Sequence, residues 1–203
     1  KMWPVVALGA TLLAFSPVII GKSAGLMWLL SPAALAALAL PAYRSDDITD
    51  ADREYIRAAA AGSWRYLQDF STAEDNFLPP DNFQEQPPVG TAHRTSPTNI
   101  GFAMAAAVAA CDMDIITRED AAGYISRVAV TLEKMPRFMG HWYNWYDTRT
   151  LSPLVPQYVS TVDSGNLCAC LIALSQGLRE KGYPELAEQA QALADAMKFR
   201  PLY

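Results

Sequence analysis

Hydrophobic and polar positions divide the chain into two parts of different character. Two runs near the N-terminus, residues 2–20 and 23–43, contain no charged residue, and Lys22 separates them. The first run has nearly the length that a helix needs to cross about 30 Å of hydrocarbon. The second run contains Pro32, which makes it a weaker candidate. The pattern predicts one transmembrane helix with a second or a re-entrant segment, and a buried hairpin of a soluble protein is the alternative.

From residue 44 onward the pattern changes abruptly and predicts helices, with no strand pattern of comparable strength. Thr49 with Asp52 has the spacing of a capping box and predicts a helix over about 50–70. Thr117 with Asp120 has the same spacing and predicts another helix that extends to about residue 135.

Three further helices follow from other terminal signals. Ser96 followed by Pro97 is typical of a helix start. Another helix begins near residue 163, with Asp163 or Ser164 as its N-cap, and ends at Gly182. A last helix opens at Pro184.

The five predicted helices alternate in hydrophobic pattern. The second and fourth are apolar on all sides over most of their length, which is typical of buried helices, whereas the other three are amphipathic. Long loops, about 71–95 and 137–162, precede the two apolar helices, and the other connections are short. Inner and outer helices with both long loops at one end are the layout of an α/α toroid, and a small bundle would not cover two fully apolar helices.

The fold prediction is therefore all-α. We expect an incomplete α/α toroid of about two and a half helical hairpins, preceded by one or two transmembrane helices. The predicted domains are a membrane part, 1–43, and the N-terminal part of a toroid, 44–203.

Both long loops combine aromatic rings with fixed polar groups. The segment 140–150, "GHWYNWYDTRT", holds four Trp and Tyr residues, an Asp and an Arg in eleven positions, and no helical or strand period explains it. Rings match the apolar face of a sugar, while carboxylates, amides and guanidinium groups match its hydroxyls. The composition therefore indicates a carbohydrate cleft, although protein–protein interfaces use the same residue types.

Each candidate also has a purely structural interpretation. The two Trp rings of this segment can cover the core, and Asp163 can act only as an N-cap. Arg94 and the Arg of the second loop can pair with nearby aspartates to hold the loops. Glu85 lies beside prolines that stiffen its backbone. Glycoside cleavage needs two carboxyl groups at a defined separation, which a sequence does not supply.

Composition narrows the classes of partner. A net charge of -5 gives no general basic surface for nucleic acid. The two histidines lack ligand spacing, so no metal site is predicted. The three cysteines lie in apolar stretches and read as reduced thiols. Because the chain starts with Lys and ends in an aromatic residue, we expect it to be a piece of something longer.

Four motifs in order resemble one family, the bacterial cyclic β-1,2-glucan synthases: "NFLPPDNFQE", "AHRTSPTNIG", "GHWYNWYDTRTL" and "YVSTVDSGNL". The resemblance covers about residues 50–200, and residues 1–43 resemble the end of the membrane region that precedes this part in the family. It implies a long inner-membrane enzyme whose glycosyltransferase polymerises glucose from UDP-glucose and whose central toroid carries out transglycosylation and cyclisation.

On this resemblance the chain is the last membrane segment and the first part of the toroid, with its soluble part in the cytoplasm. It implies no cofactor in this segment, UDP-glucose as donor elsewhere in the parent enzyme, and catalytic carboxylates beyond residue 203. The partners it implies are the glucan chain, the other parts of the parent and the lipid bilayer. The isolated segment is expected to be inactive.

The trio expected to stack on glucose rings is Trp142, Trp145 and Tyr146. The residues expected to bind hydroxyls or support those that do are Asp81, Glu85, Arg94, Asp147, Arg149, Asp163 and Asn166. One alternative is a non-catalytic helical scaffold whose aromatic loop docks another domain of the same synthase. Another is an unrelated small membrane-anchored helical protein.

Overall fold

The structure is a computed structural model that describes residues 3–39 and 48–202. The chain divides into two compact units, Lys1–Thr49 and Asp50–Tyr203. The predicted domain boundary between residues 43 and 44 lies outside the described residues.

The first unit is a helical hairpin of α1 (Trp3–Phe15) and α2 (Ile19–Ala39). The two helices cross so closely that a Cβ added to Gly9 would lie 2.9 Å from the carbonyl oxygen of Gly25. Such close backbone approach between apolar helices is typical of membrane proteins. The pair therefore packs through its glycines and leaves its large apolar side chains exposed.

The membrane prediction chose the wrong run as the stronger span. Helix α1 ends at Phe15, just before Pro17, so the first uncharged run is not one continuous helix. Helix α2 instead continues through Lys22 and Pro32. Its segment 19–38 is long and apolar enough to cross a membrane.

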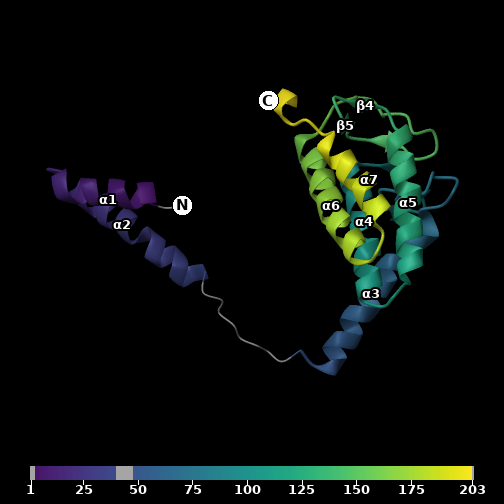
Figure 1. Ribbon diagram of the computed structural model, residues 1–203, viewed down its shortest axis with the longest axis horizontal. Helices are drawn as coiled ribbons and strands as arrows, with labels where there is room; N and C mark the ends of the chain where they lie inside the picture. Colours follow the sequence, from purple (N-terminus) through teal and green to yellow (C-terminus); the bar gives the residue numbers. More distant parts are fainter. Residues whose placement is uncertain (1–2, 40–47, 203) are drawn as a thin grey trace. The chain divides into compact units, whose positions relative to one another are not determined.

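The second unit contains the five predicted helices and one short 3₁₀ turn. They are α3 (Asp50–Phe70), α4 (Pro97–Asp112), α5 (Arg118–Lys134), α6 (Thr161–Glu180), α7 (Pro184–Asp195) and the turn Arg200–Leu202. Helices α4 and α6 pack against each other; α3 and α5 pack on α4, and α7 packs on α6 (Figure 1). The predicted alternation of inner and outer helices is confirmed.

The terminal signals set most of the helix bounds. Ser96 caps α4 by accepting a hydrogen bond from the backbone of Asn99, and Thr117 with Asp120 forms the predicted capping box of α5. The prediction for α6 was wrong: Ser160 is its N-cap, so Asp163 lies in the first turn. Its carboxylate is thereby available for tertiary contacts instead of capping.

Six two-residue strands lie in the long loops and were not predicted. They pair as β1 (Phe83–Gln84) with β2 (Gly90–Thr91), β3 (Arg94–Thr95) with β6 (Tyr146–Asp147), and β4 (Arg137–Phe138) with β5 (His141–Trp142). Strands this short carry no readable period. They fold each loop back on itself and join the two loops to each other.

The core lies between the inner and outer helices. Ile100 and Met104 of α4, Ile125 of α5 and Leu167 of α6 are fully buried. The inner helices are not covered on every side within this chain, since Phe102 of α4 is 57% exposed.

Candidate functional site

The two long loops meet at one end of the second unit. Strand β3 of the first loop pairs with β6 of the second, placing Arg94 opposite Asp147 and Thr95 opposite Tyr146. Residues on either side of this ladder add to the connection: the backbone of Thr148 donates to the carbonyl of His93 at 3.1 Å. The prediction that both loops emerge at the same end is confirmed.

Asp163 joins the first turns of both inner helices. Its Oδ1 accepts a 2.6 Å hydrogen bond from the Thr98 hydroxyl of α4, and Asn166 of α6 donates to the same hydroxyl oxygen at 3.1 Å. The N-termini of α4 and α6 therefore lie side by side, directly beneath the joined loops. Helix N-termini favour negative charge, so a carboxylate is well placed here.

Asn144 connects this helix pair to the aromatic segment. With the amide oriented by its neighbours, so that its nitrogen faces the carboxylate of Asp163, that nitrogen donates to Oδ2 at 2.7 Å, and the amide oxygen accepts from Trp145 Nε1 at 2.6 Å and from the Tyr158 hydroxyl at 2.8 Å. In this orientation the amide nitrogen faces an acceptor and the amide oxygen faces two donors. Asp163 is consequently a hub that accepts a hydrogen bond on each carboxylate oxygen, one from α4 and one from the aromatic segment.

Arg94, Asp81 and Trp145 form a half-exposed cluster beside the hub. Arg94 donates two hydrogen bonds to Asp81 Oδ2, at 3.1 and 2.8 Å, and its guanidinium carbon lies 5.0 Å from the centre of the Trp145 ring. The predicted alternative, in which Arg94 pairs with an aspartate to hold the loops, is thus present. Trp145 remains partly exposed, so the cluster offers a planar ring, a cation and a carboxylate together.

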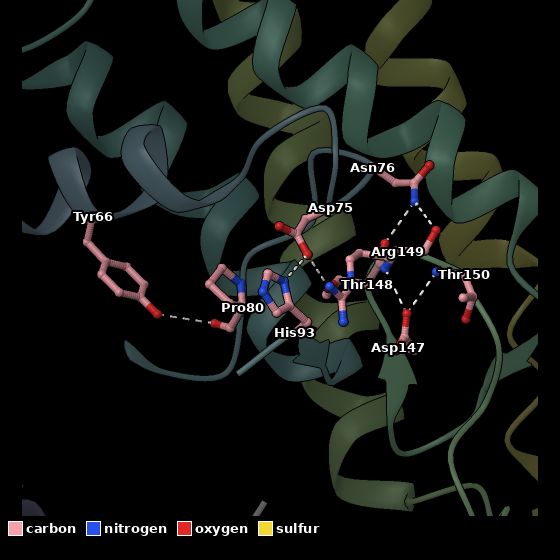
Figure 2. Close-up of polar contacts among 9 residues, drawn as sticks. All are labelled: Tyr66, Asp75, Asn76, Pro80, His93, Asp147, Thr148, Arg149 and Thr150. Carbon is pink, nitrogen blue, oxygen red and sulfur yellow. Dashed lines mark hydrogen bonds and ion pairs between the residues drawn. The ribbon is translucent and has the colours of Figure 1, made fainter. Parts of the chain in front are cut away.

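Asp147 holds the turn that follows β6. Its carboxylate accepts hydrogen bonds from the backbone of Arg149 at 2.9 Å and of Thr150 at 2.8 Å (Figure 2). Burial opposes ionisation of Asp147, but the hydrogen bonds from Thr150 and Arg149 outweigh it and hold its pKa below the ordinary value. The side chain of Arg149 is exposed.

Two of the three rings predicted to stack on glucose are core residues instead. Trp142 is 1% exposed and donates its Nε1 hydrogen to the carbonyl of Leu132, and Tyr146 is fully buried. The Tyr146 hydroxyl donates to the carbonyl of Pro136 at 2.6 Å, and burial raises its pKa. Neither ring presents a face to a ligand, so the stacking prediction is wrong for both.

Glu85 is not brought to this cluster. It lies in the turn between β1 and β2, where its side chain is exposed. No hydrogen bond or ion pair of Glu85 occurs among the described residues. Its position therefore differs from that of Asp81, which the same loop places against Arg94.

The sequence analysis missed residues that contact the predicted ones. Thr98, Asn144 and Tyr158 complete the hub around Asp163. Asp75 was not considered, yet its buried carboxylate lies 2.7 Å from His93 Nδ1 (Figure 2). Spacing along the chain gave no signal for these contacts, because each joins segments that are distant in sequence. In the described part of the chain, no three His, Cys, Asp or Glu side chains are grouped to hold a metal.

Comparison with known proteins places this geometry in context. No protein-family model matches the chain. Over 187 residues, 88% of the chain, it is 41% identical to the cyclic beta-(1,2)-glucan synthase NdvB of Rhizobium meliloti strain 1021. The chain is homologous to a segment of a cyclic β-1,2-glucan synthase. It spans only 7% of that relative's length. The resemblance carried by the four loop motifs is thereby confirmed.

Solved structures show the same fold at low identity. An endo-beta-1,2-glucanase from Chitinophaga pinensis matches 72% of this chain and 37% of its own, with a TM-score of 0.60 and 19% identity. A beta-1,2-glucanase from Parabacteroides distasonis matches 71% of this chain and 20% of its own, with a TM-score of 0.59 and 19% identity. The predicted fold, a part of a helical toroid, is confirmed.

Proposed function

We propose that residues 50–203 form one wall of a β-1,2-glucan cleft in the transglycosylation and cyclisation domain of a cyclic β-1,2-glucan synthase. The observation that carries the proposal is the meeting of both long loops above the N-termini of α4 and α6. The homologous synthase and the β-1,2-glucanase folds support a glucan as the ligand. Catalytic carboxylates would come from other parts of the parent enzyme, and the 203-residue segment alone would be inactive.

Within this wall the exposed groups would contact sugar and the hub would hold them in place. Trp145, Arg94 and Asp81 combine a ring with charged hydrogen-bonding groups, which suits a glucose unit. Asp163 and Asn166 would fix the helix ends and, through Asn144, the ring of Trp145.

The N-terminal unit would anchor the segment in a bacterial inner membrane. Helix α2 has the length and composition to span a bilayer, and this supports membrane association of the homologous segment. The toroid would lie on the cytoplasmic side, where UDP-glucose, the donor for the parent enzyme's glycosyltransferase, is available. The remaining parts of the parent polypeptide would complete the toroid.

The experiment is a Trp145→Ala substitution in the full-length parent synthase. Cyclic product and linear polymerisation from UDP-glucose are measured separately. Losing a ring contact of about 0.5–1.5 kcal/mol should lower cyclisation roughly twofold to tenfold and leave polymerisation unchanged. Phe138→Ala is the matched control, because Phe138 is a 48% exposed ring in the same loop but outside the cluster.

Three outcomes separate the interpretations. Selective loss of cyclic product in Trp145→Ala, with an unaffected Phe138→Ala control, supports the cleft. Loss of assembly, or of both activities together, supports a scaffold that docks another domain. Unchanged cyclisation in Trp145→Ala contradicts the proposal.

A further inference from the structure

A buried carboxylate holds a partly exposed imidazole within the proposed cleft wall. Asp75 is 3% exposed, and its Oδ1 lies 2.7 Å from Nδ1 of His93 (Figure 2). The His93 side chain, in contrast, is 31% exposed. A carboxylate on Nδ1 fixes both the tautomer and the orientation of an imidazole ring, which leaves the opposite nitrogen for other partners.

The same carboxylate oxygen also fastens the second loop. The hydroxyl of Thr148 donates to Asp75 Oδ1 at 2.5 Å, and the backbone of Thr148 donates to the carbonyl of His93. Thr148 is fully buried. The carboxylate that contacts the imidazole is therefore bound by both long loops, and His93 precedes Arg94 in the sequence.

The backbone beside Asp75 is strained. Phe77 has φ of 61°, a region that costs an ordinary side chain roughly 1–2 kcal/mol, and Asn76, a residue type that tolerates this region better, has φ of 53°. The Asn76 side chain is fixed by donating to the carbonyls of Thr148 and Arg149 at 2.8 and 2.9 Å. Strained residues of this kind persist where the surroundings determine them, and they cluster at functional sites.

The free nitrogen of His93 is accessible. Nε2 makes no hydrogen bond among the described residues, and it is not one of their buried unpartnered atoms. His141 is the opposite case, because the whole residue is buried and neither of its ring nitrogens has a hydrogen-bond partner in the described part of the chain. Of the chain's two histidines, His93 is therefore the one whose ring is accessible to a ligand.

We propose that His93 binds a hydroxyl group of the β-1,2-linked glucan through Nε2, and that Asp75 is its positioning residue. The inference rests on the proposed function, because it takes the glucan as the ligand of this surface. With Nδ1–H donated to Asp75, Nε2 accepts a hydrogen bond from a sugar hydroxyl. Thr148 fixes Asp75 and the backbone of His93, and the Asn76 side chain fixes the backbone of Thr148 and Arg149.

The experiment observes both imidazoles directly. The full chain, 1–203, is labelled with ¹⁵N-histidine, placed in detergent micelles and titrated with a linear β-1,2-linked glucose oligosaccharide. The two histidines give two sets of ring signals. Binding is followed independently by the indole N–H signals of tryptophan.

The expected result is that the Nε2 signal of His93 shifts as sugar binds while the signals of His141 stay constant. His93→Gln should weaken binding about tenfold, which corresponds to one hydrogen bond. Asp75→Ala should weaken it similarly, and Asp75→Asn, which retains an acceptor oxygen, should recover part of the loss. Asp120→Asn is the control, because this carboxylate caps α5 at the short-loop end.

The outcomes separate this inference from the proposed function. The inference is overturned if sugar shifts the indole signals but not the Nε2 signal of His93, and if His93→Gln binds sugar normally. Asp75 and His93 would then only stabilise the loops. If sugar moves no signal, the proposed function fails and the inference fails with it. Should Asp75→Ala not fold, the His93→Gln result alone decides.

Discussion

Replacing Gly140 by alanine should destabilise the second unit more than the same substitution at a glycine that has open space around it. Gly140 has φ of +84°, and a Cβ placed on it would lie 2.0 Å from the carbonyl oxygen of Ala196. The left-handed conformation alone costs an alanine about 1–2 kcal/mol. The overlap is with backbone at the end of α7, which cannot rotate away, and overpacking of this kind costs about 1–3 kcal/mol. The two effects together predict a loss of about 2–5 kcal/mol.

Two other glycines separate these contributions. Gly182 has φ of +88° with open space around the added Cβ, so Gly182→Ala should lose only about 1–2 kcal/mol. Gly165 lies in α6 with no atom within 4 Å of its added Cβ, so Gly165→Ala should gain about 0.5–1 kcal/mol.

Urea denaturation of the full chain in micelles, followed by circular dichroism, measures all three variants. The expected order of stability, from most to least stable, is Gly165→Ala, wild type, Gly182→Ala and Gly140→Ala. Equal losses for Gly140→Ala and Gly182→Ala would show that the contact with Ala196 is absent, and the reasoning would be refuted.

Three more results are expected from the contacts of the loops and helices. Trp142→Ala should cost about 3–5 kcal/mol in a urea melt, because the ring is buried and its hydrogen bond to Leu132 is lost; a change below 1 kcal/mol would place the ring outside the core. The folded pKa of Asp147 lies below its ordinary 3.8, so its stabilisation is complete above that value and disappears as pH falls through the folded pKa. Asp147→Asn should therefore lose less stability than wild type in acid melts below pH 4, and parallel curves would contradict this. Thr117→Ala removes the acceptor for the backbone of Asp120 and should lower stability by about 0.5–2 kcal/mol, whereas an unchanged melting curve would show that the cap contributes nothing.

The helical architecture could be predicted from the sequence because each helix carries its own local signals. Caps such as Ser96 and the Thr117–Asp120 pair act within a few residues, so their geometry depends little on tertiary contacts. The cap of α6 was misassigned because Ser160 and Asp163 are both good N-cap residues. Only the tertiary contact of Asp163 with Thr98 distinguishes them.

The site was less predictable because its residues meet through the fold. The aromatic segment has no period, so nothing in its spacing distinguishes the buried rings of Trp142 and Tyr146 from the partly exposed ring of Trp145. Asp75 and His93 are 18 residues apart in the sequence. The strained turn that follows Asp75 contains no glycine, so the sequence carries no signal for it. Composition predicted a site in these two loops, and only burial distinguishes their accessible side chains from those of the core.

The most direct measurement is a structure of the full-length parent synthase with a bound β-1,2-linked glucan oligosaccharide. The account predicts sugar rings against the joined loops at the N-termini of α4 and α6, within hydrogen-bond distance of Arg94 and His93 and in contact with Trp145. A glucan bound elsewhere, with this end of the helices covered by another domain, would contradict the cleft and establish the segment as a scaffold.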